Sequence, residues 1–308
     1  MSTAPQGSPG QRLAVLQLLA GAAIIGSNGL MVRFAGTAPT TSAFWRMLLS
    51  AIFLAALVHW RGGWRTLSPR AWWWVALPSL AFAADLWMWH RSILLVGPGL
   101  STLLANAQVF FMALAGVLFF GERPGPRFFA GVLLAFAGLW LLLGGDWATL
   151  PAQYRWGVWL GLATGAAYAA YNIGLKRAQA EAALATGRPA LEQVLCLAAL
   201  GSALCLGLVG VAEGSDLRIP SWHAFWVLVA LAGFGHCLSW VLISRSMVSL
   251  PVAVVGLLLL FQPMVAYLLD VLVLDLQTSP RQWAGLLVTM VGIFVAGLRR
   301  RRPPAPRN

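Results

Sequence analysis

The stretch Gly21–Arg33, GAAIIGSNGLMVR, occurs a second time in the chain as Gly165–Arg177, GAAYAAYNIGLKR. Both copies begin with Gly-Ala-Ala, carry an asparagine at the eighth position (Asn28 and Asn172) and end on arginine. A match between segments this far apart indicates an internal duplication. We therefore expect the chain to fold as two structurally related halves.

Other residues of the two halves align at one constant spacing. The matched pairs are Arg91 with Arg245, Gln108 with Gln262, Arg127 with Arg281, Gly131 with Gly285 and Gly138 with Gly292. This spacing is about ten residues wider than that of the first match, because the loop after Arg177 is longer than its counterpart. The halves thus share one order of segments.

The composition is typical of a membrane protein. Of the 308 residues, 59% are hydrophobic and only 10% are charged, and the mean hydropathy is +0.77. Such a chain is too apolar for a water-soluble domain. The net charge of +12 comes mainly from arginines between apolar segments and near the C-terminus, so it indicates membrane topology and not a nucleic-acid partner.

Ten apolar segments have about the 20 residues that a membrane-crossing helix needs. They lie near 13–34, 40–60, 71–92, 98–120, 127–145, 156–177, 191–212, 222–246, 251–274 and 281–298. We predict an all-α membrane protein with ten transmembrane helices in two five-helix repeats. Because five is odd, the second repeat enters the membrane in the opposite sense, and the repeats are predicted to be inverted.

Positive charges predict the orientation. With the N-terminus inside, fifteen lysines and arginines fall on the cytoplasmic side and five on the other, so both termini are expected in the cytoplasm. The predicted parts are a cytoplasmic tail (1–12), the first repeat (13–146), the second repeat (147–298) and a basic cytoplasmic tail (299–308). We expect a multi-pass protein of a bacterial-type cytoplasmic (inner) membrane.

Three features resemble a known family. They are the run Phe119–Gly144, FFGERPGPRFFAGVLLAFAGLWLLLG, the triplet Phe44-Trp45-Arg46, and the paired asparagines of the first and sixth segments. With the helix count and the repeat, they resemble the drug/metabolite transporter superfamily, and best its ten-helix metabolite exporters built from two EamA domains. The second half departs from the pattern, having Asp275-Leu276 where Gly-Glu would fall.

The resemblance implies a secondary active transporter that exports a small polar metabolite, such as an amino acid or a related compound, by alternating access. Two alternatives stay open: a membrane-embedded enzyme acting on a lipid or small metabolite, and a multidrug or toxic-compound exporter of the same fold. We predict no enzyme and no cofactor, because the sequence contains no Walker A, HExxH, GxSxG or dinucleotide motif. The expected partners are a small-molecule substrate and the lipid bilayer. For the oligomeric state, both a monomer and a dimer stay open.

The stretch Ala81–Ser101, AFAADLWMWHRSILLVGPGLS, contains the most deeply placed acidic residue, Asp85. A carboxylate at that depth costs about 2.5–3.5 kcal/mol on insertion scales and normally faces a bundle interior or a cavity. Asp85 and Trp89 share one helical face. We expect Asp85 to bind a substrate ammonium or to exchange protons with the substrate; the alternative is a structural ion pair with Arg46 or Arg91.

Polar and aromatic residues at equivalent depths complete the predicted substrate site. The candidate substrate-binding residues are Asn28, Asp85, Trp89, Asn106, Gln108, Tyr168, Asn172, His236, Trp240 and Gln262. Asp85 and His236 are also candidates for proton coupling, although His236 could instead be a packing residue. Arg46, His90 and Glu122 are assigned gate or structural roles, and Asp270 a solvated position. No metal site is expected, since four histidines and three scattered cysteines lack ligand spacing.

Overall fold

No strand occurs among residues 9–120, 125–143, 147–187, 190–249 and 258–297, the ranges that the structure, a computed structural model, describes. The helices of the first half are α1 (Pro9–Phe34), α2 (Pro39–Trp60), α3 (Pro69–Val96), α4 (Pro98–Ala105), α5 (Gln108–Phe120) and α6 (Pro126–Leu143). Those of the second half are α7 (Ala152–Thr186), α8 (Leu191–Ala212), α9 (Trp222–Ala232), the π-helical turn η2 (Gly233–Leu238), α10 (Ser239–Ser249), α12 (Phe261–Val273) and α13 (Pro280–Gly297). A short 3₁₀ helix, η1 (Trp147–Thr149), precedes α7.

Six helical stretches of the described chain are long and apolar enough to cross a membrane. They are Gly10–Phe34, Pro39–Trp60, Pro98–Phe119, Pro126–Leu143, Leu191–Ala212 and Trp222–Ile243. The helices α12 and α13 are apolar but shorter. α3 and α7 are longer, with 28 and 35 residues, and carry the polar side chains of the candidate site.

Prolines and serines set where several helices begin. Proline occupies the first position of α2, α3 and α4, where its missing N–H is not needed and its fixed φ suits a helix. Ser68 caps α3 by accepting a hydrogen bond from the Ala71 N–H at 3.1 Å. In the same way, Ser221 caps α9 by accepting a hydrogen bond from the Ala224 N–H. The helix starts are therefore encoded locally.

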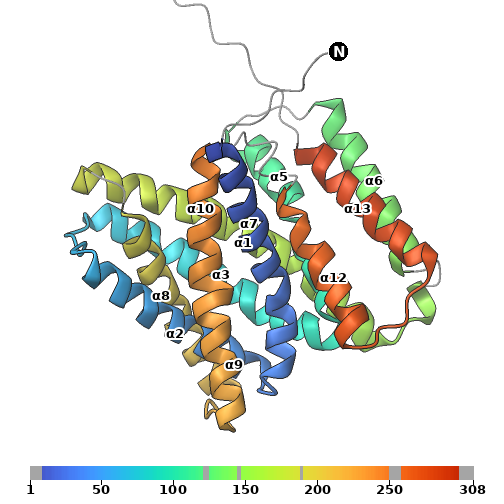
Figure 1. Cartoon of the computed structure of the whole chain (residues 1–308), viewed down its shortest axis with the longest axis horizontal. Coiled ribbons are helices and arrows are strands. Elements are labelled where there is room, and N and C mark those ends of the chain that lie inside the picture. Colours follow the sequence, from blue (N-terminus) through green and yellow to red (C-terminus); the bar gives the residue numbers. More distant parts are fainter. Residues whose placement is uncertain (1–8, 121–124, 144–146, 188–189, 250–257, 298–308) are drawn as a thin grey trace, which may run out of the picture.

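The packing of the helices stays the same when the two halves are exchanged. α3 packs against α7, and their equivalents, α10 and α1, pack against each other. α5 contacts α7, and correspondingly α12 contacts α1. Two helices pack against their own equivalents: α2 against α8 and α6 against α13. Figure 1 shows α1 beside α10 and α6 beside α13. A site at the centre therefore receives side chains from both halves.

Glycines bring α6 and α13 into close backbone contact. A Cβ atom at Gly131 would collide with the Gly292 carbonyl, and one at Gly138 would collide with the Gly285 carbonyl. Small residues allow this approach between membrane helices. Since Gly131 faces Gly292 and Gly138 faces Gly285, the two helices run antiparallel. These four glycines are two of the matched pairs in the sequence, so the contact itself is symmetric.

The predicted helix at 98–120 is not continuous. The chain turns at Asn106 and Ala107, between α4 and α5, where Asn106 Nδ2 donates to the Thr102 carbonyl at 2.8 Å. An asparagine that bonds the backbone of its own helix competes with regular helix geometry. Leu260, the repeat equivalent of Asn106, also lies in a turn, before α12. The interruption therefore recurs at the matching point of both halves.

The predicted helix at 222–246 is interrupted as well. Between α9 and α10 it forms the π-helical turn η2, which contains the buried His236. Such turns release backbone carbonyls from the regular helical pattern, and they are frequent at functional sites. The Gly235 carbonyl accepts a hydrogen bond from Asn28 Nδ2 at 2.9 Å.

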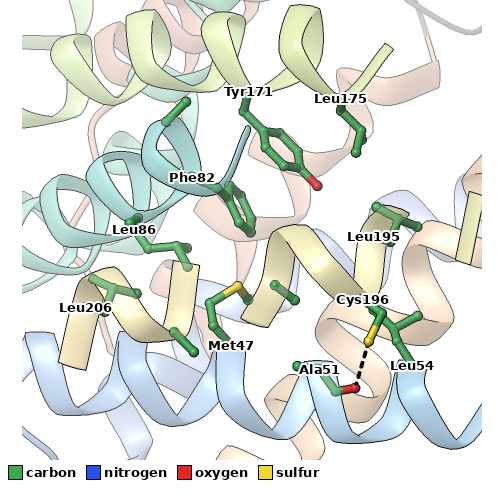
Figure 2. Packing of buried hydrophobic residues seen from close by; sticks show 14 of the residues in the cluster. Met47, Ala51, Leu54, Phe82, Leu86, Tyr171, Leu175, Leu195, Cys196 and Leu206 are labelled. Carbon is green, nitrogen blue, oxygen red and sulfur yellow. Dashed lines mark hydrogen bonds between the residues drawn. The ribbon is translucent and has the colours of Figure 1, made fainter. Parts of the chain in front are cut away.

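A hydrophobic core joins α2, α3, α7 and α8. Figure 2 shows Met47 and Leu54 of α2 facing Leu195 and Leu206 of α8. Cys196 is buried there, and its Sγ lies 3.4 Å from the Ala51 carbonyl oxygen, which accepts its hydrogen bond. The core holds the helices that carry the candidate site in fixed positions.

Candidate functional site

Arg46 lies within α2 and is only 5% exposed. Its Nε and Nη1 atoms are buried and have no hydrogen-bond acceptor in the described structure. The guanidinium carbon lies 5.5 Å from the centre of the Trp89 ring, within the range of a cation–π interaction. Buried donors without acceptors are costly, so Arg46 is suited to bind an anionic group that reaches it.

Asp85 lies on α3, is 6% exposed and interacts electrostatically with Arg46. Neither ion pair considered for Asp85 forms. The ion pairs within the described part of the chain are Arg61–Glu192, Arg70–Glu181 and Arg91–Glu213. A buried positive and a buried negative group therefore lie near each other without direct contact, which leaves both available to a ligand.

Aromatic rings surround these two charges. Phe82, one turn before Asp85, stacks on Tyr171 with ring centres 4.3 Å apart; Figure 2 shows the two rings together. Tyr168 stacks on Tyr171 at 6.1 Å, and Tyr168 also interacts electrostatically with Asp85. His236 lies 5.6 Å from the Phe82 ring, and Trp240 lies 6.1 Å from Tyr171. The cluster thus combines α2 and α3 with α7, η2 and α10.

Two asparagine side chains next to this cluster are involved in contacts between helices. Asn172 Nδ2 donates to Gln108 Oε1 at 2.9 Å, which ties α7 to the start of α5. It also donates to the Tyr168 carbonyl. Asn28 is fully buried, and its Oδ1 has no donor in the described structure. Both asparagines therefore join helices close to the cluster.

Other predicted residues form contacts of their own. Asn106 bonds within its own helix, and Gln262 is buried at the start of α12. His90 is fully buried, with its Nδ1 3.2 Å from the Pro39 carbonyl oxygen. Glu122 lies outside the described residues.

The prediction that Asp270 is solvated is wrong. Asp270 is 3% exposed, and its Oδ2 accepts a hydrogen bond from the Gly99 N–H at 2.7 Å. Gly99 lies in the first turn of α4, where free N–H groups and the helix dipole favour a negative charge. Asp270 thus caps a helix of the opposite half.

A pocket of about 200 Å³ reaches the cluster from one end of the bundle. Its lining includes His236 and Trp240 on the inside and Glu192 and Arg245 toward the helix ends. It lies between α2, α8, η2 and α10. The cluster is thus approached from the end where α2 and α10 finish.

Polar contacts close the opposite end. Glu213, just after α8, accepts hydrogen bonds from Thr40 at 2.7 Å and from Trp87 at 2.7 Å. It also pairs with Arg91 at 2.8 Å, and Arg91 lies 4.1 Å over the Trp87 ring. Burial alone would raise the pKa of Glu213, but the bonds from Thr40 and Trp87 and the charge of Arg91 outweigh it. The pKa of Glu213 is therefore lowered from its ordinary value of 4.5.

The two ends are chemically unequal. α2 and α8 both have 22 residues, so aligning their starts makes Arg61 the equivalent of Glu213 and Glu192 the equivalent of Thr40. Arg61 and Glu192 pair at 2.7 Å. However, Arg245, the equivalent of Arg91, lines a pocket together with Arg61, whereas Arg91 pairs with Glu213. The like charges of Arg61 and Arg245 repel each other, which disfavours a direct contact between them.

Sequence reasoning missed Phe82 and the Glu213 contacts. Phe82 precedes Asp85 by three residues and Trp89 by seven, so helical spacing could have placed all three on one face. No comparable spacing in the sequence indicates the contacts of Glu213. No group of three potential metal ligands occurs among the described residues. The arrangement suits a small molecule with a negative, a positive and an apolar part.

Comparison with known proteins decides the family. The model of the EamA-like transporter family matches residues 12–144 and 155–298. The chain belongs to the EamA-like transporter family. This confirms the resemblance expected from the sequence, and it makes the protein a multi-pass membrane transporter.

The EamA-like transporter described here is similar to the uncharacterized transporter YwfM of Bacillus subtilis (strain 168). The two are 24% identical over 286 residues, which cover 90% of this chain and 91% of that protein. A crystal structure with 19% identity has the same fold, with a TM-score of 0.64 over 92% of this chain and 96% of the other.

Proposed function

We propose that this EamA-like transporter is a secondary exporter of small zwitterionic metabolites, such as amino acids or related compounds. The main support is the pair formed by Arg46 and Asp85, two buried opposite charges that do not bond to each other. Arg46 binds the substrate carboxylate and Asp85 its ammonium group. The rings of Phe82, Trp89 and Tyr168 hold the apolar part.

The proposed architecture has ten transmembrane helices in two inverted repeats (13–146 and 147–298). Inversion requires equivalent helices to run in opposite directions. In α2 and α8, Phe44 lies near Gly207 whereas Arg61 pairs with Glu192, so these helices are antiparallel. α6 and α13 are antiparallel too. Both termini lie in the cytoplasm, and the membrane is the cytoplasmic one.

The open end supports export. In the proposed orientation, the pocket that contains Trp240 opens to the cytoplasm, and the Arg91–Glu213 end faces outward and is closed. An exporter loads its substrate in this state. Opening the outer end requires Glu213 to leave its partners, while closing the inner end brings Arg61 and Arg245 closer.

Proton exchange couples transport to a gradient. Asp85 lies within the cluster and His236 between the pocket and the cluster, so a proton can pass between them as the site changes sides. Asp85 also interacts with Tyr168.

The test is transport by purified protein in sealed liposomes, after a thermal-shift screen of metabolites to find a ligand that raises stability. We expect a zwitterionic metabolite to cross the membrane unchanged. Asp85→Asn should abolish this flux, or its pH dependence, while the protein still folds. Chemical conversion without net flux would identify an enzyme instead. Stabilisation by unrelated hydrophobic compounds alone would favour a multidrug exporter.

A further inference from the structure

A second pocket, of about 420 Å³, opens between α2 and the η2–α10 segment. It is lined by Phe53, Leu57, Arg61, Gly233, Cys237, Leu238, Val241 and Arg245. Apart from the two arginines, this lining carries no charge. It shares Cys237, Val241 and Arg245 with the pocket that reaches the central cluster, so it lies at the side of that entrance.

The two arginines mark the edge of the apolar region. Arg61 directly follows the apolar span Pro39–Trp60, and Arg245 lies two residues beyond the span Trp222–Ile243. Both side chains are exposed. Arg61 has Glu192 on one side, whereas Arg245 forms no ion pair within the described chain. The rim of the pocket thus carries net positive charge at the depth of lipid head groups.

Apolar side chains continue from each arginine toward the middle of the membrane. Leu57 and Phe53 lie one and two turns before Arg61 on the same face of α2. Val241 lies one turn before Arg245 on α10. Eight residues of helix span about 12 Å, enough to contact a large part of an acyl chain. The pocket therefore combines a cationic rim with an apolar groove.

We infer that this pocket binds an anionic phospholipid, with its phosphate at Arg245 and Arg61 and one acyl chain along Phe53, Leu57 and Val241. Basic pockets between helices at the membrane surface attract such head groups. A neutral lipid offers no net charge to the rim, and a soluble phosphate offers no chain to the groove. The bound lipid covers the side of the entrance to His236.

Native mass spectrometry of the delipidated full-length protein tests this site. Phosphatidylglycerol should bind more tightly than phosphatidylcholine with the same chains. Arg245→Gln should weaken phosphatidylglycerol binding about fivefold and leave phosphatidylcholine binding unchanged. Arg12→Gln is the matched control, because Arg12 is also exposed but lies outside the pocket, and it should change nothing.

A second variant tests the groove. Val241→Phe fills it without changing any charge, and it should also weaken phosphatidylglycerol binding. Equal binding of both lipids overturns the inference, as does an equal effect of Arg12→Gln. So does competition by glycerol phosphate at the same concentration as the lipid, since the site would then take a soluble anion. Unchanged binding by Val241→Phe contradicts the acyl-chain position.

Discussion

Arg46 is a buried charge whose proposed role in binding comes at a cost in stability. Its Nε and Nη1 have no acceptor in the described structure, and Asp85 is close enough to interact but not to bond. Each of the two charges partly compensates for the other. Removing one leaves the other uncompensated, whereas removing both relieves the burial cost.

We predict that the double variant Arg46→Met/Asp85→Leu is more stable than wild type, by about 1–4 kcal/mol, and transports nothing. Each single variant should be less stable than the double. Thermal unfolding in detergent measures the stabilities, and liposome flux measures the activity. A double variant less stable than both single variants would show that the charges stabilise the fold.

Glu213 is expected to make stability depend on pH. Its pKa is lowered, so its carboxylate stabilises the folded protein above pH 4.5, and this contribution disappears as the pH falls through the lowered pKa. Glu213→Gln should reduce the unfolding temperature at pH 7 by about 2–4 °C. The difference from wild type should shrink below pH 4.5. A difference that stays constant with pH would contradict the role of the charge.

Part of the cluster that forms the candidate site could be predicted from the sequence. Asp85 and Trp89 share a helical face, and the repeat pointed to Asn28 and Asn172, because these relations follow from spacing along one helix or between copies. Glu213 was missed since its contact with Arg91 joins residues 122 positions apart that no periodicity relates.

At the scale of the elements, the contact between α6 and α13 depends most directly on glycine, because the two backbones approach where no side chains separate them. At Gly138 an added Cβ would meet the backbone N of Thr289 and the carbonyl of Gly285. The helices would have to separate, and overpacking of this kind costs about 1–3 kcal/mol.

We therefore predict that Gly138→Ala lowers the unfolding temperature. Gly10→Ala is the control, because Gly10 also lies in a helix but has no atom within 4 Å of the added Cβ, and it should not destabilise the protein. Equal unfolding temperatures for Gly138→Ala and wild type would mean that α6 and α13 are not in backbone contact.

Hydropathy found the helices but not their interruptions. The turn at Asn106 lies among Leu103, Leu104 and Ala107, so the average hydropathy across it stays high. A side-chain hydrogen bond from Asn106 to the Thr102 carbonyl accompanies this turn, but the matching turn at Leu260 has no asparagine. Apolar length alone cannot distinguish a continuous helix from a broken one.

At the scale of the whole molecule, the proposed inversion of the repeats predicts the sides on which the loops lie. Single cysteines at Arg127 and Arg281, in a protein whose native cysteines are replaced, should react with an impermeant maleimide from opposite sides. Arg127 should be labelled from the cytoplasm and Arg281 from outside. Labelling of both from one side would rule out inversion.

The repeat predicted that the two halves share one order of helices, because duplicated segments keep their sequence order. It could not predict which end is closed. That choice depends on Arg61 and Glu213, which occupy equivalent positions but carry opposite charges. A difference of this kind becomes visible only when their neighbours are known.

In the proposed mechanism, the opposite charges of Arg46 and Asp85 also determine how the carrier responds to voltage. The membrane potential falls mainly across the closed end, so a net charge at the site crosses the field whenever the open side changes. One uncompensated charge costs about 2.3 kcal/mol per 100 mV. Exchange moves the site across the membrane only while it is filled. A zwitterion held between a charged Arg46 and a charged Asp85 leaves the filled site neutral, and we predict exchange that is insensitive to an imposed potassium diffusion potential. Residual exchange by Asp85→Asn should become voltage-dependent, because only the Arg46 charge then remains to be moved.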